Sequence, residues 1–151
     1  WYEIGTAKQL EWFMAYVNEA DPSAKAKLTA DIEANDIVWS PIGTIDRPFT
    51  GTFDGQGFTI NGLKYTDYRG ECSGMFGKTG PTALIKHLTL KDCKFGNNNK
   101  YVGSFCGWNE GTLLNCLNQN TTVSGMNAGG ICGRNSGTIS NCLSTGKVSR
   151  Y

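Results

Sequence analysis

Proline, histidine and long apolar runs are scarce in this sequence. It contains 4 prolines and one histidine, His87, and no stretch approaches the ~18 consecutive apolar residues of a membrane-spanning helix. These absences speak against membrane insertion and against a zinc site, since His87 has no second histidine beside it and no CxxC pair is present. The net charge of +1 gives no reason to expect nucleic acid as a partner.

Carboxylates are nearly absent from the C-terminal part of the chain. Residues 1–92 contain 12 acidic side chains, whereas residues 93–151 contain one, Glu110, beside 5 basic side chains. Glycoside hydrolysis needs two carboxylates roughly 5–9.5 Å apart. The clearest repeats therefore cannot hold such a pair; a site formed by Asp67, Glu71 and Asp92 remains open, but no spacing singles these residues out. We predict a non-catalytic protein without a cofactor and keep an enzyme fragment as the alternative.

Glycine, by contrast, is abundant, with 20 residues. Glycine excess without proline excess indicates many tight turns rather than a collagen or a flexible linker. From about residue 42 onward no window shows a sustained 3.6-residue periodicity, which excludes ankyrin, TPR and HEAT repeats. A chain of this length should form one domain.

The sequence repeats itself. Residues 132–142 read CGRNSGTISNC and residues 106–116 read CGWNEGTLLNC, with seven of eleven positions identical at a period of 26 residues. Weaker copies continue toward the N-terminus and predict two stacked apolar columns. The first column is Ile60, Ile85, Leu113 and Ile139; the second is Phe53, Met75 or Phe76, Phe105 and Ile131.

A period of about 26 residues is typical of a solenoid, whereas a propeller blade needs roughly 40–45 residues. Three short parallel strands per coil fit this length, so we predict an all-β fold, a right-handed parallel β-helix with coils of 25–28 residues over 42–151. Asn115 and Asn141 are expected to form a ladder at a corner. Gly107 and Gly133 are expected at tight turns.

The N-terminal segment, residues 1–41, differs from the repeats and is predicted to cap the first coil. Residues 6–9, TAKQ, have the spacing of a capping box, and the apolar stripe Leu10, Phe13, Met14 and Val17 follows. The pattern predicts a helix over about 7–19. Residues 27–32, KLTADI, are predicted to form the first strand. The repeat pattern stops partway through a copy at the C-terminus, so we expect the coils to continue in a longer protein.

Several stretches together resemble a known family. They are TAKQL (6–10), KLTADI (27–32), WSPIG (39–43), FTGTFDGQGFTI (49–60) and the two CGxNxGT copies. This resembles the GLUG-repeat β-helix regions of large bacterial cell-surface and secreted proteins of the gut Firmicutes type, over nearly the whole chain. The resemblance implies an extracellular or cell-surface location and a stalk or adhesin-like role. It also implies, as an alternative, a non-catalytic region of a surface protease. It supplies no catalytic residues.

Aromatic side chains expected in turns or loops are candidates for binding a host glycan or protein. This ligand-binding set is Tyr65, Tyr68, Tyr101 and Trp108, together with Arg134. Trp108 is the strongest candidate, because its repeat counterpart Arg134 shows that the position has no structural need for an aromatic ring. Both are expected to face solvent at a turn.

The six cysteines leave two interpretations open. In an extracellular protein the repeat could pair Cys106 with Cys132 and Cys116 with Cys142 as disulfides. Alternatively, the cysteines serve as small buried apolar side chains.

Asp54, between glycines, lacks the ligand pattern of a calcium loop and is interpreted as a turn residue. The open last coil predicts self-association as a further possibility.

Overall fold

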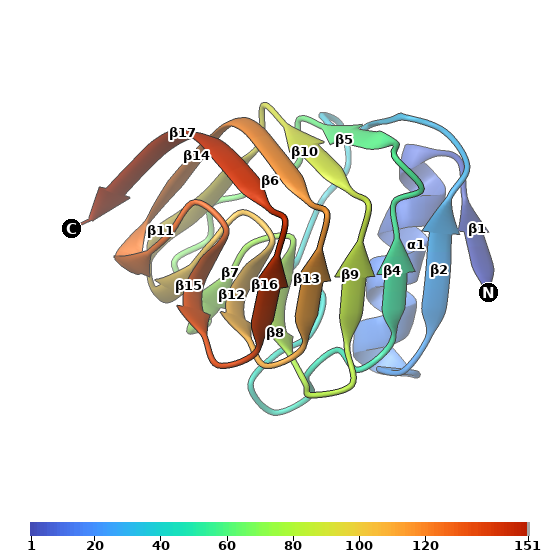
Figure 1. Ribbon diagram of the computed structural model, residues 1–151, viewed down its shortest axis with the longest axis horizontal. Helices are drawn as coiled ribbons and strands as arrows, with labels where there is room; N and C mark the ends of the chain where they lie inside the picture. Colours follow the sequence, from blue (N-terminus) through green and yellow to red (C-terminus); the bar gives the residue numbers. More distant parts are fainter. Residues whose placement is uncertain (151) are drawn as a thin grey trace.

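The computed structural model describes residues 1–150, and its chain winds into a parallel β-helix with one α-helix at the N-terminal end (Figure 1). The strand pairings in this part of the chain are parallel throughout. The predicted fold class, a mostly-β solenoid with a capping helix, is confirmed.

The strands form three sheets that run along the axis. Sheet A has the order β1 (Tyr2–Ile4), β2 (Lys25–Leu28), β4 (Thr52–Asp54), β9 (Leu84–Lys86), β13 (Thr112–Leu114) and β16 (Thr138–Ser140). Sheet B has the order β3 (Ile32–Glu33), β5 (Thr59–Asn61), β10 (Thr89–Lys91), β14 (Leu117–Ala128), β11 (Lys94–Val102) and β6 (Lys64–Tyr65). At its margins, β17 (Leu143–Arg150) pairs with β14, and β7 (Cys72–Ser73) pairs with β11. Sheet C has the order β15 (Cys132–Asn135), β12 (Cys106–Asn109) and β8 (Phe76–Thr79).

Interior side chains of successive coils stack in register, as the repeat predicts. In sheet A, Ile85 pairs with Leu113 and Leu113 pairs with Ile139. The placement of Ile60 in this column is wrong, because Ile60 lies in sheet B and pairs there with Leu90. Its place is taken by Phe53, which pairs with Ile85. The loop 66–71 lengthens the coil between Phe53 and Ile85. Counting back from Ile85 by one repeat period therefore reaches Ile60, in sheet B, instead of Phe53.

The second predicted column is confirmed in sheet C for its Met75 alternative and is wrong for Phe53. In sheet C the aligned residues are Phe76, Cys106 and Cys132. Met75, Phe105 and Ile131 lie one position before these residues and are therefore in register with one another, whereas Phe53 belongs to sheet A. Because Met75 and Phe76 are adjacent apolar residues, the sequence left this position open, and the register of sheet C selects Met75.

The predicted helix is confirmed as α1 (Ala7–Glu19). Thr6 Oγ1 accepts a hydrogen bond from the Gln9 amide at 3.2 Å, and Gln9 Oε1 accepts one from the Gly5 amide at 2.7 Å, which satisfies free donors at the helix start. Leu10, Phe13 and Val17 are buried, with the Phe13 ring centroid 5.9 Å from that of Phe53. The helix therefore covers the interior of the first coils.

The first strand differs from the prediction. β1 precedes the helix and pairs with β2, and the predicted strand at 27–32 is divided between β2 in sheet A and β3 in sheet B. The Thr29 amide donates to the Ile4 carbonyl at 2.9 Å, at the bend that separates the two strands. Alternating polarity shows that the segment is extended, but not where it turns a corner.

Gly107 and Gly133 lie within β12 and β15 rather than at turns, so that prediction is wrong. A Cβ atom at Gly107 would lie 2.7 Å from the Tyr101 carbonyl oxygen and 2.8 Å from Cys72 Cβ. Glycine is kept there because the backbones of neighbouring segments approach each other closely.

The predicted asparagine ladder is confirmed at the corner between sheets A and B. Asn141 Nδ2 donates to Asn115 Oδ1 at 2.6 Å, and the Asn115 amide lies 3.3 Å from His87 Nδ1. All three residues have a left-handed backbone, with φ of 53° or 54°. Asparagine is among the few residues that tolerate this conformation, and the histidine accepts it as part of the ladder.

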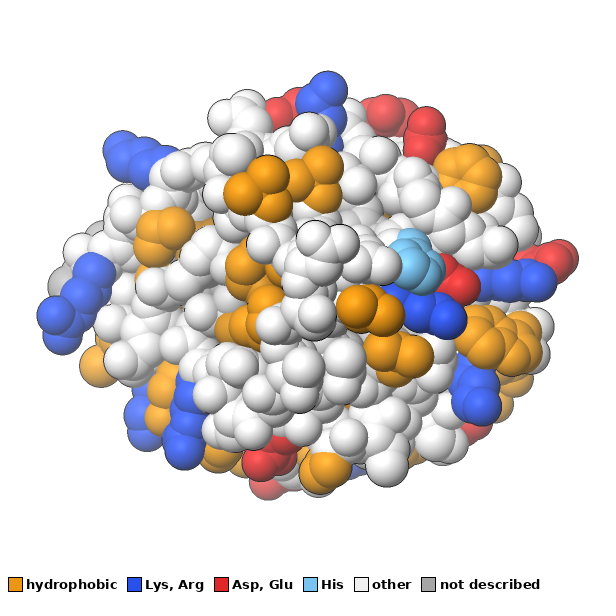
Figure 2. Space-filling model, viewed as in Figure 1, with side chains coloured by type: hydrophobic (Ala, Val, Ile, Leu, Met, Phe, Trp, Pro, Cys, Tyr) orange, Lys and Arg blue, Asp and Glu red, His pale blue; other side chains and the backbone are white. Residues whose placement is uncertain are grey.

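The interior is exposed at the C-terminal end. Ile139 is 37% exposed and Leu143 is 62% exposed, whereas Leu113, one coil earlier, is fully buried. Figure 2 shows Lys and Arg side chains, without Asp or Glu beside them, at this end of the molecule (left).

Tyr151, the last residue of the predicted 42–151 region, lies outside the described residues. Within the described residues no helix is long and apolar enough to cross a membrane.

Candidate functional site

A stack of cations and an indole ring lies on the outer face of sheet C. Lys78 of β8, Trp108 of β12 and Arg134 of β15 are in register on adjacent strands. Lys78 Nζ is 4.0 Å and Arg134 Cζ is 4.1 Å from the centroid of the Trp108 ring. Because the two cations come from strands on opposite sides of β12, they cover both faces of the indole. We call Lys78, Trp108, Arg134 and the adjacent Tyr101 the cationic stack.

Tyr101 completes this cluster from the end of β11. Its ring centroid is 5.7 Å from that of Trp108, and its hydroxyl accepts a hydrogen bond from Arg134 Nη1 at 3.4 Å. Lys100 Nζ lies 5.4 Å from the Tyr101 ring. The structure thus brings together three of the five residues predicted for binding. They lie on strands, so the expectation that they occupy turns is wrong.

The charges of the cationic stack are only partly neutralised. Lys78 Nζ forms an ion pair with Glu110 at 3.2 Å, and the Lys78 side chain is only 13% exposed. No carboxylate of residues 1–150 lies within ion-pair distance of Arg134. A guanidinium that is held against a ring and has no acidic partner is suited to a planar carboxylate or to a sulfate. A sugar cannot stack on the Trp108 face unless it displaces a cation.

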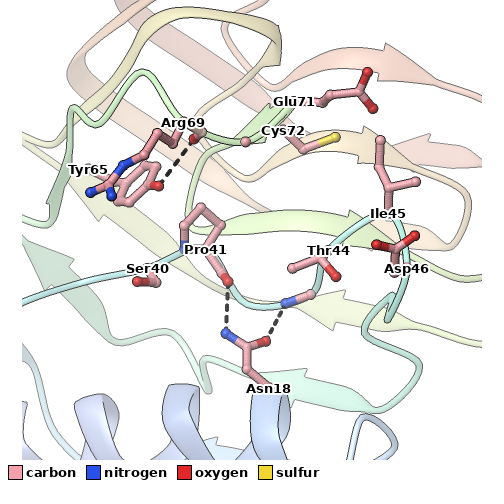
Figure 3. Close-up of a pocket in the computed structure, with 12 residues that line it drawn as sticks. Asn18, Ser40, Pro41, Thr44, Ile45, Asp46, Tyr65, Arg69, Glu71 and Cys72 are labelled. Atoms are coloured by element: carbon pink, nitrogen blue, oxygen red, sulfur yellow. Dashed lines mark hydrogen bonds between the residues drawn. The ribbon is translucent and has the colours of Figure 1, made fainter.

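A pocket lies on the side of the β-helix and contains Tyr65. It has a volume of about 400 Å³ and lies between the loop that follows β3 and the loop 66–71, beside the end of α1 (Figure 3). We call it the side pocket; its lining is Asn18, Ser40, Pro41, Gly43, Thr44, Ile45, Asp46, Tyr65, Arg69, Gly70, Glu71 and Cys72. Tyr68 is 72% exposed and lines neither the side pocket nor the cationic stack.

The three acids of the enzyme alternative are not brought to one place. Asp67 is held by Arg69, whose guanidinium lies 3.0 Å and 3.1 Å from its two oxygens, and these hydrogen bonds lower the pKa of Asp67 to about 2. Asp92 Oδ1 accepts a hydrogen bond from Asn120 at 2.8 Å, at the corner after β10. Glu71 alone of the three lines the side pocket.

The cysteines are free thiols within the described chain, and four of the six are buried. Cys106 pairs in register with Cys132. Burial raises the pKa of the Cys93 thiol to about 11 and that of Cys116 to about 12. No cluster of three or more His, Cys, Asp or Glu residues that could hold a metal ion occurs among residues 1–150.

Sequence reasoning missed several residues of these sites. Lys78 follows Met75 by three positions, as Trp108 follows Phe105, so the Met75 alternative of the second column aligns it with Trp108, but the prediction did not draw this consequence. Asp46 and Asn18 belong to segments without a repeat, and no sequence signal places them beside Tyr65.

Comparisons with known proteins identify a sequence motif and two relatives of this chain. The model of the GLUG motif matches residues 124–149. Halomucin of Haloquadratum walsbyi is 32% identical over 113 residues, and a candidate Gly-rich membrane protein of Evansella cellulosilytica is 30% identical over 92 residues. These matches cover 67% and 59% of this chain, but the chain spans only 1% and 11% of the two relatives.

The fold is also found in a solved structure. The crystal structure of a candidate immunoglobulin A1 protease from Bacteroides ovatus superposes with a TM-score of 0.69 at 21% identity, over 96% of this chain and 57% of that one. These three proteins come from different organisms, so the comparisons do not support the expected origin of this chain in the gut Firmicutes. The chain is a parallel β-helix that carries the GLUG motif, as the resemblance of its sequence indicates.

Proposed function

We propose that this chain is a non-catalytic module of an extracellular or cell-surface protein. In this proposal it is a rigid spacer that recognises an acidic group on a host glycan or protein through the cationic stack. The observation that carries the proposal is the guanidinium of Arg134, which lies against Trp108 and Tyr101 without a carboxylate partner among residues 1–150. The much greater length of the relatives fits a module within a larger protein.

Rigidity follows from the way the coils are joined. Parallel ladders connect each coil to the next in three sheets, and interior columns are filled by large apolar side chains. In such a solenoid each coil contacts only its neighbours, so the array lengthens without a change of cross-section. This geometry favours the role of a rigid spacer that holds the cationic stack at its surface.

The absence of a carboxylate pair in the repeats favours binding over hydrolysis. Glu110 is the single acid of residues 93–150, and it is paired with Lys78. Asp67 is engaged by Arg69, and a carboxylate with a pKa of about 2 is a poor general acid or base near neutral pH. The side pocket is better explained by binding than by cleavage.

The proposal is tested by binding the purified chain to an array of neutral, sialylated and sulfated glycans and to mucin. We expect retention of acidic ligands and at least about tenfold weaker binding for Arg134→Gln, since a charge-assisted hydrogen bond contributes roughly 1.5–3 kcal/mol. Trp108→Ala should weaken binding less, because it loosens the guanidinium without removing it. Lys25→Gln, an exposed cation in sheet A, is the matched control.

Two outcomes would contradict this proposal. The first is equal retention of neutral and acidic glycans. The second is binding that falls equally in Arg134→Gln and Lys25→Gln, which would show unspecific attraction to positive charge.

End-to-end association is a second candidate, favoured by charge. Residues 129–150, the open coil, contain three bases (Arg134, Lys147 and Arg150) and no acid, whereas residues 1–21 contain four acids (Glu3, Glu11, Glu19 and Asp21) and one base, Lys8. Sedimentation velocity at rising concentration should show oligomers that dissociate in high salt and in Leu143→Glu. Tyr68→Glu is the control. A monomer at all concentrations and low salt contradicts this proposal.

A further inference from the structure

The side pocket is a second feature whose construction needs explanation. It adjoins the cationic stack through the backbone, since the Tyr101 amide donates to the Glu71 carbonyl at 2.9 Å, but it shares no lining residue with that stack. It is formed by two loops that interrupt the repeat, 34–51 and 66–71. Both loops are held in one conformation by side-chain amides, that of Asn18, which is half-buried, and that of Asn99, which is buried.

The first wall is fixed by Asn18 of α1. Its Nδ2 donates to the Pro41 carbonyl at 3.0 Å, and its Oδ1 accepts from the Gly43 amide at 2.9 Å. Figure 3 shows Asn18 reaching up from the helix between these two points of the loop. Between them, Ile42 forms a bridge to Phe76, so the wall is also joined to sheet C.

The second wall is fixed by Asn99 of β11, which is fully enclosed. Its Nδ2 lies 3.1 Å from the Asp67 carbonyl, 3.3 Å from that of Arg69 and 2.9 Å from that of Gly70. The Tyr65 hydroxyl donates to the Arg69 carbonyl at 3.4 Å. The pocket is therefore preformed, which is typical of ligand sites because preorganisation reduces the entropic cost of binding.

The lining combines an aromatic ring, apolar side chains and unpaired carboxylates. In Figure 3, Tyr65 and Arg69 lie on one side of the pocket, and Ile45, Asp46 and Glu71 lie on the other. Among residues 1–150 the carboxylates of Asp46 and Glu71 have no hydrogen-bond or ion-pair partner, whereas Arg69 is engaged by Asp67. The pocket thus offers acceptors and negative charge on one side and a ring on the other.

We infer that the side pocket binds a neutral sugar unit of an oligosaccharide. A pyranose has an apolar C–H face suited to an aromatic ring such as that of Tyr65, and hydroxyl groups that donate to carboxylates such as Asp46 and Glu71. The volume of about 400 Å³ lies in the range of sites for small ligands, roughly 300–1,000 Å³. Unpaired carboxylates repel an acidic sugar, so this ligand class differs from that of the cationic stack.

The test is a titration of the labelled chain with neutral sugars. Binding is measured from changes in the backbone amide resonances in nuclear magnetic resonance spectra. The probes are methyl glucosides, methyl galactosides, lactose and cellobiose, with galacturonate and Nα-acetyl-lysine as charged comparisons. At least one neutral probe should give saturable shifts at Asp46, Tyr65 and Glu71. Galacturonate should give none.

Variants show whether the shifts depend on the proposed contacts. Glu71→Gln and Asp46→Asn should each weaken binding by about tenfold, equivalent to about 1.4 kcal/mol. Tyr65→Leu should abolish it. Tyr68→Leu, outside the pocket, should have no effect, and Arg134→Gln should have none either, which separates this site from the cationic stack.

The inference fails if no neutral probe binds, or if binding is unchanged in Glu71→Gln and Asp46→Asn. Both of these side chains are exposed, so the two variants remain informative even if Tyr65→Leu does not fold. It also fails if Nα-acetyl-lysine binds more tightly than every neutral probe, since the pocket would then be a site for cations.

Discussion

The side-chain amide of Asn109 donates a hydrogen bond to Asn135 Oδ1 at 2.9 Å, from one coil to the next. Asn109 Oδ1 in turn accepts one from Thr79 Oγ1 at 2.7 Å and one from the Gly111 amide at 3.1 Å. Asn109 is fully buried although it is polar. The asparagine that follows CGx in each repeat therefore forms an interior ladder, which satisfies backbone at the corner between sheets C and A.

This ladder predicts unequal costs for the two repeat copies. Asn109→Ala removes the acceptor of the Thr79 hydroxyl inside the protein and leaves the Gly111 amide only its longer hydrogen bond, to Thr79 Oγ1 at 3.4 Å. We therefore expect a loss of about 1–3 kcal/mol in the free energy of unfolding. Asn135→Ala, in the exposed last coil, should cost less, since water replaces the lost group. Urea denaturation followed by circular dichroism measures both. Equal losses would mean that the ladder does not stabilise the interior.

The column in sheet A predicts a second contrast. Leu113 is fully buried and Ile139, its register partner in the next coil, is 37% exposed. Leu113→Ala should cost about 2–5 kcal/mol, as expected for a buried residue in a packed core. Ile139→Ala should cost clearly less, because one side of this residue faces solvent. A loss as large at Ile139 would show that another surface covers the open end in solution.

Local signals in the sequence were sufficient for the cap and the repeat. Thr6 and Gln9 lie at the helix start as their spacing predicts, since a capping box depends on residues within one turn. The CGxNxGT copies give the register of the last coils, because both copies have the same length. Ile139 therefore lies above Leu113 as predicted.

Positions that depend on distant segments were not predictable in the same way. Gly107 is required by the approach of Tyr101 and Cys72, which come from other parts of the coils. The sandwich of Trp108 depends on Lys78, which the sequence aligns with Trp108 only if Met75, and not Phe76, occupies the second column. The side pocket depends on Asn18 and Asn99, which lie in unrelated elements and meet the pocket loops only after the chain has folded.

The ion pair of Asp67 and Arg69 predicts a dependence on pH. Hydrogen bonds from Arg69 lower the pKa of Asp67 from the ordinary value of 3.8 to about 2. Because the pKa is lower in the folded state, the pair contributes its stability above about pH 4, and the contribution disappears as the pH falls through about 2. Asp67→Asn should therefore be less stable than the wild type at pH 6, by a small amount because the pair is exposed, and equally stable near pH 1.5.

Denaturation curves of both proteins across this pH range test the prediction. Arg69→Gln should give the same convergence at low pH, since it removes the other half of the pair. A difference between wild type and Asp67→Asn that persists at pH 1.5 would mean that packing, rather than charge, is lost in the variant.

The cysteines predict slow and selective alkylation. Cys116 Sγ donates to the Leu114 carbonyl at 3.4 Å, and Cys142 Sγ donates to the Ser140 carbonyl at 3.3 Å, so each thiol proton has a partner at the same corner of successive coils. A disulfide sulfur has no proton to donate, so a bond between these two residues would give up both interactions. This arrangement favours thiols.

Alkylation by iodoacetamide without reductant, read by mass spectrometry, tests this state. The thiolate is the reactive form, so thiols with a pKa of about 11 or 12 should react very slowly at pH 8 in the folded chain. Cys132 and Cys142, the partly exposed pair, should be labelled first. After unfolding all six should react, because burial is then removed and no disulfide protects them. Two or four labels after unfolding would instead show disulfides. Cys116 and Cys142 could then join successive coils covalently and would not act as hydrogen-bond donors.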